Sequence, residues 1–305
     1  MHICENCSNF ADEMKLYPNC KINLGLRVVR KREDGYHDLE TVFVPVYGLC
    51  DELEVMPTAD GTLTFQQEGI AVDCDPEDNL IVKCYRQMAS KYPQIGPVST
   101  RFRKNIPFGA GLGGGSSDAA HMAVALNELF DLRLNKEQLA AEVRSLGADC
   151  PFFIYNTPCY AEGIGDILTP VALNMKGMRI IMIKPDEGVS TKEAYSGITR
   201  HPEVSGQIKS LLFLGNGHDS FCPKDGIFTN DFEATVFPQH PVIADIKKRL
   251  LDAGAFYASM SGSGSTVFGL FKNDPEGRTN AKLRVLKEEF ASMVLLDDTF
   301  GEWKA

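Results

Sequence analysis

A run of glycines near residue 110 is the part of this chain best suited to chemistry. Five glycines fall between residues 109 and 115, and Ser116, Ser117 and Asp118 follow directly. Glycine reaches positive φ angles and has no Cβ, so successive backbone N–H groups can turn toward one concavity. A helix that begins at Ser117 or Asp118 adds unpaired N–H groups and the positive end of its dipole. The run therefore predicts a phosphate-binding loop, with a plain capped loop before a helix as the alternative.

The same glycines permit a second interpretation. Gly109, Gly111 and Gly114 match the GxGxxG pattern of dinucleotide-binding enzymes, with Asp131 about where a ribose-binding acid would lie. That pattern needs a buried strand before it and another strand that ends at the acid. Here residues 101–104 include three basic side chains, and a helical pattern follows Asp131. An oxidoreductase is therefore disfavoured, and the absence of Gly-Lys-Ser/Thr from the sequence disfavours a Walker loop.

Two other places combine polar residues at useful spacing. Lys21–Val29 alternates as a half-buried strand does, and on a strand residues two apart share a face, about 6–7 Å apart. Lys21 and Asn23 therefore point together, either into solvent or toward a ligand. Asp149 lies two residues before Pro151, where it would serve as the N-cap of a short helix or as a general base.

Composition bounds the class of protein. The chain has 305 residues, 44% of them hydrophobic and 24% charged, as in soluble globular proteins of one large or two ordinary domains. The formal net charge of −10 favours a small-molecule enzyme over a nucleic-acid binder. We expect no membrane segment, because no run of about 18 apolar residues occurs, and we find no signal-peptide pattern. These features predict a cytoplasmic protein.

The nine cysteines are interpreted as reduced thiols, as expected in the cytoplasm. Cys4 and Cys7 form a CxxC pair next to His2, but a zinc site needs a second ligand pair at suitable spacing, and none follows nearby. Regular patterning begins only near Met14. We therefore expect residues 1–13 to be an unstructured extension.

The remaining pattern mixes strands and helices without a regular β-α-β alternation, which predicts an α+β fold with antiparallel sheets. Strands are expected at 21–29, 41–47, 51–56, 61–67, 100–104, 179–183, 256–260, 266–271 and 293–296, and helices at 77–92, 118–130, 135–146, 241–253 and 279–290. Asn135 and Gln138 have the spacing of a capping box at the start of the third of these helices. A domain boundary is expected between 160 and 175, where glycine and proline cluster.

The glycine run resembles the phosphate loop of the GHMP kinases, a family that includes galactokinase, homoserine kinase and mevalonate kinase. Further segments in the expected order are Pro18–Leu24, Asp34–His37, Glu77–Ile81, Leu146–Phe153 and Ser261–Gly264. Together they extend the resemblance from about Lys15 to the end of the chain. Two departures are Cys20, where alanine is usual, and Asp118, where asparagine is common.

The resemblance implies a two-domain GHMP fold: a ribosomal-protein-S5-domain-2-like domain over residues 14–165 and a ferredoxin-like domain over 166–305. It implies an enzyme that uses ATP, with Mg²⁺ carried by the nucleotide rather than by a protein cage and assisted by Ser116 or Ser117. The residues implied to bind ATP are Asn79, Leu80, Pro107, Phe108, Gly109, Ala110, Gly111, Leu112, Gly113, Gly114, Gly115, Ser116 and Ser117.

Asp-Gly-Tyr-His at residues 34–37, together with the triple glycine, points to the branch of the family whose acceptor is a cytidine diphosphate-linked methylerythritol. The residues implied to bind this acceptor are Asn23, Tyr36, His37 and Tyr195, and Lys21 and Asp149 are implied to be catalytic. We expect small-molecule substrates, no nucleic acid or membrane partner, and a monomer or weak homodimer. A sibling kinase acting on homoserine or a mevalonate derivative, and a non-catalytic ATP-binding sensor on the same fold, are the alternatives.

Overall fold

The computed structural model describes residues 13–301 except 60, 62, 72–74, 199–205, 207, 210–225 and 273–277. Two compact units are present, and each combines segments that are distant in the sequence. Unit 1 comprises the segment that ends at Pro18, Cys50–Asn105 and Gly115–Tyr155, and unit 2 comprises Asn19–Leu49, Ile106–Gly114 and the chain from Asn156 onward. The expectations for Cys4, Cys7 and the extension before residue 13 lie outside the described residues, and the domain boundary at 165 stays a prediction.

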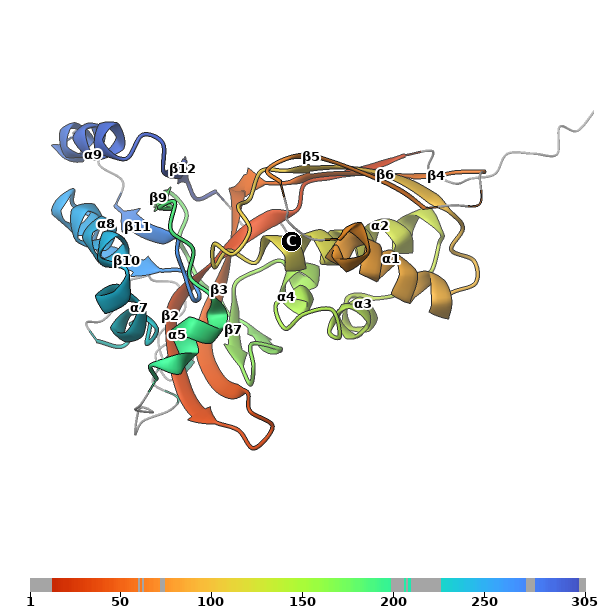
Figure 1. Ribbon diagram of the computed structural model, residues 1–305, viewed down its shortest axis with the longest axis horizontal. Coiled ribbons are helices and arrows are strands. Elements are labelled where there is room, and N and C mark those ends of the chain that lie inside the picture. Colours follow the sequence, from red (N-terminus) through yellow and green to blue (C-terminus); the bar gives the residue numbers. More distant parts are fainter. Residues whose placement is uncertain are drawn as a thin grey trace, which may run out of the picture. The chain divides into compact units, whose positions relative to one another are not determined.

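Unit 1 is a four-stranded sheet with helices on one face (Figure 1). Its strands, in sheet order, are β1 (Met14–Leu16), β4 (Glu52–Pro57), β6 (Val98–Lys104) and β5 (Thr64–Gly69). Its helices are the 3₁₀ turn η1 (Pro76–Asp78), α1 (Leu80–Lys91), α2 (Gly114–Leu129), α3 (Lys136–Val143) and α4 (Cys150–Tyr155). The β5–β6 pair is parallel, so the expectation of purely antiparallel sheets is wrong there.

Local sequence explains where these helices begin. The Asn79 side chain accepts a hydrogen bond from the Ile81 N–H and so caps α1. Asn135 and Gln138 form the predicted capping box at α3. The glycine run behaves differently, because α2 begins at Gly114 rather than at Ser117 or Asp118.

Unit 2 contains two further four-stranded sheets. The first has the order β2 (Asn19–Lys31), β3 (His37–Cys50), β7 (Cys159–Glu162) and β8 (Ile167–Pro170). The second has the order β10 (Tyr257–Met260), β11 (Val267–Phe271), β9 (Arg179–Ile183) and β12 (Val294–Thr299). The helices of unit 2 that the structure describes with bounds are α5 (Thr191–Ser196), α7 (Glu233–Gln239), α8 (Pro241–Asp252) and α9 (Arg278–Glu289).

Strand β9 separates the two hydrophobic cores of unit 2. Ile181 and Ile183 belong to the core that α7, α8 and α9 cover, whereas Ile180 and Met182 face the core shared with β2 and β3. Successive side chains of a strand point to opposite faces, so this apolar strand is buried on both sides. No helix in the described ranges is long and apolar enough to span a membrane.

Candidate active site

The glycine run has the conformation that its composition predicts. Gly109, Gly111 and Gly113 have φ angles of 63°, 75° and 71°, in the left-handed region that favours glycine. A Cβ on Gly111 would lie 1.9 Å from the carbonyl oxygen of Ser261, so no larger residue fits there without moving the backbone. Phe108, at the start of the loop, is 72% exposed.

Lys21 lies against this loop within unit 2. Its Nζ donates to Asn23 Oδ1 at 2.7 Å and to the Gly111 carbonyl at 3.2 Å, and its backbone N–H donates to the Leu112 carbonyl at 3.0 Å. Lys21 and Asn23 are only 4% and 2% exposed. The polar face of β2 is therefore buried rather than solvated, and it brings an ammonium group to the loop.

A short chain of hydrogen bonds fixes the orientation of Asn23. Its Nδ2 donates to Thr41 Oγ1 at 3.0 Å, and the Thr41 hydroxyl donates to the Gly25 carbonyl. Because the amide nitrogen is used in this way, the amide oxygen faces Lys21. Sequence analysis missed Thr41, whose signal is a hydroxyl directly before the apolar run of residues 42–46.

The turn at Ser261–Gly264, which follows β10 in the second sheet of unit 2, is hydrogen-bonded to the glycine loop. Ser261 Oγ donates to the Gly111 carbonyl at 2.9 Å, and the Thr266 N–H donates to the Ala110 carbonyl at 3.3 Å. The Gly111 carbonyl thus accepts from both Lys21 and Ser261. This turn is consequently part of the loop's support and not only a hairpin.

The first turn of α2 presents its two serines differently. Ser117 is fully buried, and its hydroxyl lies 3.4 Å from Nδ1 of His121, whose ring also contacts the Ser117 carbonyl at 2.8 Å. Ser116 is partly exposed. Its hydroxyl hydrogen-bonds to Cys150, whose thiol pKa burial raises to about 12. Of the two serines, Ser116 is therefore the more exposed.

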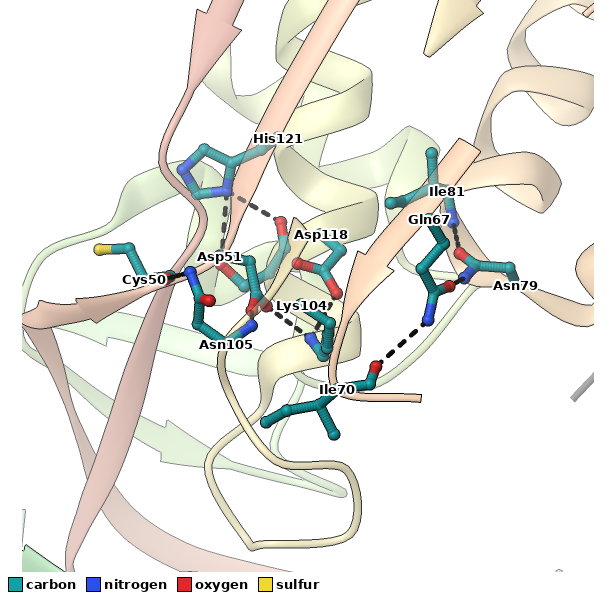
Figure 2. Close-up of polar contacts among 11 residues, drawn as sticks. Cys50, Asp51, Gln67, Ile70, Asn79, Ile81, Lys104, Asn105, Asp118 and His121 are labelled. Carbon is teal, nitrogen blue, oxygen red and sulfur yellow. Dashed lines mark hydrogen bonds and ion pairs between the residues drawn. The ribbon is translucent and has the colours of Figure 1, made fainter. Parts of the chain in front are cut away.

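The remaining predicted ATP residues lie in unit 1. Asn79 caps α1 and also donates to Gln67 Oε1 at 3.4 Å (Figure 2). Leu80 begins α1, and a Cβ on Gly115 would lie 3.6 Å from its Cδ1. Asn79 thus has the structural role of a cap, Leu80 adjoins the start of α2, and contact of either with adenine stays a prediction.

Asp149 lies between α3 and α4 in unit 1. Its carbonyl accepts from the Phe152 N–H at 3.2 Å, so the residue occupies the position before α4 that an N-cap would take. Its side chain is partly exposed, which suits a group that meets a substrate. Pairing of Asp149 with Lys21 stays a prediction.

A buried charge cluster, which sequence analysis missed, lies in unit 1 (Figure 2). Lys104 Nζ donates to Asp51 Oδ2 and to Asp118 Oδ2 at 2.5 and 2.7 Å, and the Asn105 N–H donates to Asp51 Oδ1. Burial would lower the pKa of Lys104, but the two carboxylates outweigh it and raise the pKa. Lys104 and Asp118 flank the glycine run in sequence, so this contact joins the segment before the run to the helix after it. The alternation of β6 was the available signal, because Lys104 follows Thr100 and Phe102 on the buried face.

Two predicted acceptor residues meet in unit 2. The rings of His37, at the start of β3, and Tyr195, in α5, stack with centroids 4.6 Å apart and planes 20° apart. Tyr195 also meets Phe232 edge-on at 4.7 Å. Tyr36 is 62% exposed in the turn before β3, where its N–H donates to Asp34 Oδ1. The structure therefore forms an aromatic pair from segments far apart in the sequence.

Comparison with known proteins identifies the family. The family models described as GHMP kinases N terminal domain and GHMP kinases C terminal match residues 79–157 and 212–291. A 4-diphosphocytidyl-2-C-methyl-D-erythritol kinase of Bacteroides thetaiotaomicron is 50% identical over 267 residues, covering 87% of this chain and 93% of the relative. The chain is a GHMP kinase. The predicted family and α+β fold class are thus confirmed, and a kinase of this family takes its phosphoryl group from ATP.

Other relatives of this GHMP kinase agree. A protein with the same printed name from Porphyromonas gingivalis is 40% identical over 86% of the chain and 94% of its own length. A crystal structure of 4-(cytidine 5'-diphospho)-2C-methyl-D-erythritol kinase superposes with a TM-score of 0.74 at 31% identity, covering 95% of this chain and all of that one. A homoserine kinase from Cytophaga hutchinsonii has a TM-score of 0.68 at 18% identity over 97% and 96% of the two chains, a likeness in fold alone.

Proposed function

We propose that this GHMP kinase transfers the γ-phosphoryl group of ATP to the 2-hydroxyl of 4-diphosphocytidyl-2-C-methyl-D-erythritol, a step of the non-mevalonate route to isoprenoid precursors. Relatives of that name at 40–50% identity support this acceptor. The observation that carries it is the His37–Tyr195 pair, because an aromatic face suits a nucleobase and lies in the same unit as Lys21 and Asn23. Homoserine and mevalonate have no base to stack.

The loop residues 107–117 hold the phosphates of ATP, with backbone N–H groups and the start of α2 facing the negative charge. Ser116 would hold Mg²⁺, because Ser116 is partly exposed whereas Ser117 is fully buried. When bound, the ion offsets charge on the β- and γ-phosphates. In this proposal, Asn79 and Leu80 contact the adenine of ATP.

Lys21 and Asp149 carry the proposed chemistry. The Lys21 ammonium, held on the Gly111 carbonyl, offsets charge that develops on the transferred phosphoryl group. Asp149 accepts the proton of the acceptor hydroxyl as general base. Asn23 orients the acceptor, and Tyr36, His37 and Tyr195 recognise its cytosine. The enzyme works in the cytoplasm as a monomer or weak homodimer.

A coupled ADP-release assay with four acceptors tests the proposal. We expect turnover with the cytidine diphosphate-linked acceptor and far less with its uridine analogue, homoserine or mevalonate. Tyr36→Ala should raise the KM of the acceptor and leave that of ATP unchanged, since base–aromatic stacking contributes about 1–3 kcal/mol per base. Faster turnover of homoserine or mevalonate would favour a sibling kinase, and ATP binding without turnover would favour a sensor.

A further inference from the structure

The short helix α5 depends on its neighbours for its position. It has six residues, Thr191–Ser196, with Ser190 as N-cap and Gly197 directly after it. An isolated helix of this length is not stable in water, so tertiary contacts must hold it. Ala194 is fully buried in the core that α7 and α8 also contact, and Thr191 Oγ1 lies 3.3 Å from Ser263 Oγ. Any residue that fixes α5 therefore also fixes Tyr195.

His240 is the side chain that reaches α5 from α7 and α8. It lies between these two helices, and its backbone N–H donates to the Val236 carbonyl at 2.8 Å. Its ring Nδ1 lies 2.9 Å from Glu187 Oε2, and its Nε2 lies 2.8 Å from Glu193 Oε1. Glu193 belongs to α5, and Glu187 lies in the segment that joins β9 to α5.

The contacts of the ring define its charge. A carboxylate only accepts hydrogen bonds, so two carboxylates on the two ring nitrogens require two N–H donors, which only imidazolium has. The hydrogen bonds to Glu193 and Glu187 accordingly raise the pKa of His240, and the bond from His240 lowers the pKa of Glu193. On α7 and α8, Glu233 and Lys247 pair with each other. Glu187 and Glu193 are thus the charged groups that act on the ring.

Loss of the ring proton would break this arrangement. Neutral imidazole keeps one N–H and presents a lone pair at the other nitrogen, which would face a carboxylate. One of the two contacts, to Glu187 or to Glu193, then becomes repulsive. A charged hydrogen bond is then lost either in α5, at Glu193, or in the segment before α5, at Glu187.

We propose that His240 is a positioning residue for the acceptor base: by bridging Glu187 and Glu193 as imidazolium it holds α5, and so holds Tyr195 against His37. Acceptor binding then weakens as pH rises and the imidazolium loses its proton. The proposal rests on the proposed function, since it assumes that Tyr195 contacts the acceptor. His240 itself touches no substrate and acts through α5.

Steady-state kinetics between pH 6 and pH 9 test this role. We expect His240→Gln to raise the KM of the acceptor about tenfold at pH 6, within the range typical of coupling between sites, with kcat and the KM of ATP unchanged. Wild-type acceptor KM should rise with pH toward the value of the variant. His240→Arg keeps a permanent cation with several donors, so it should restore a low KM that no longer depends on pH.

A second variant tests whether the two carboxylates set this pH dependence. Glu187→Gln combined with Glu193→Gln removes the charges that raise the pKa of His240, so the rise in acceptor KM should move to lower pH. If the rise keeps its position, it does not depend on the contacts of His240 with Glu187 and Glu193, and the proposal is wrong. Equal increases in the KM of ATP and of the acceptor in His240→Gln would also overturn it.

Hydrogen exchange measured without any substrate tests whether His240 holds α5, independently of the proposed function. At pH 6, His240→Gln should speed amide exchange in residues 191–196 and leave residues 243–250 of α8 as in wild type. Unchanged exchange in α5 would overturn the proposed role of His240 even if the enzyme phosphorylates the cytidine acceptor. Faster exchange in α5 with no turnover of that acceptor by wild type would instead refute the proposed function.

Discussion

Replacing Asp118 by asparagine tests the charge state of the buried cluster in unit 1. Lys104 faces two carboxylates, Asp51 and Asp118, and the three side chains are at most 5% exposed. One ammonium cannot balance two buried carboxylates, so a proton should stay on the cluster. Burial raises the pKa of Asp118 well above its usual range, and the nearby Asp51 adds to the rise. We therefore expect Asp118 to be the protonated member of the cluster.

The sign and size of the effect follow from proton linkage. Between the unfolded pKa of Asp118, about 3.9, and its raised folded pKa, the folded protein binds more protons than the unfolded one. The stability that protonated Asp118 contributes is thus lost as pH rises, by about 1.4 kcal/mol per pH unit in that window. Asparagine keeps an oxygen for Lys104 and has no proton to lose. Asp118→Asn should therefore gain stability over wild type through the window and hold that gain above it.

Urea unfolding from pH 4 to pH 8 measures this difference. As a control, Asp245→Asn changes an aspartate whose side chain is 50% exposed, and its free energy of unfolding should stay within about 0.5 kcal/mol of wild type. Lys104→Met removes the cation from this buried carboxyl cluster and should cost about 3–5 kcal/mol. A difference between Asp118→Asn and wild type that does not change with pH would show that Asp118 is ionised, and a cost as large as that of Lys104→Met would refute the reasoning.

Three further substitutions have distinct expected results. Gly111→Ala places a Cβ 1.9 Å from the Ser261 carbonyl oxygen at a φ of 75°, so the KM of ATP should rise at least about tenfold. Gly61→Ala, where a Cβ meets open space, should leave the KM of ATP unchanged. An unchanged KM in Gly111→Ala would contradict the assignment of the loop to phosphate binding. Asp149→Asn should lower kcat about 10²–10⁴-fold with little change in Tm, and near-normal kcat at a lower Tm would leave only a capping role. Asn135→Ala removes the capping box of α3, so urea unfolding should show a loss of about 1 kcal/mol with kcat unchanged, whereas a loss of kcat in the folded protein would contradict a purely structural role.

Several local features of the structure could be predicted from the sequence. The capping box at Asn135 and the positive φ angles of Gly109, Gly111 and Gly113 follow from side-chain and backbone chemistry within a few residues, and both are present. Most strands and helices also lie within a few residues of their predicted ranges. The start of α2 was placed three or four residues late, because a glycine is a poor helix former and only the surrounding packing makes Gly114 helical.

The sequence by itself determined most of the elements, the conformation of the glycine run and the family, because periodicity and motif spacing are properties of neighbouring residues. Tertiary structure decided which polar faces are covered. Lys21 and Asn23 are buried against the loop, although their polar face is typical of a solvated strand in sequence, and Lys104 lies between Asp51 and Asp118. It also decided that Tyr195 stacks on His37. Burial and ring contacts depend on which distant segments pack together, and local hydrophobic periodicity does not encode that.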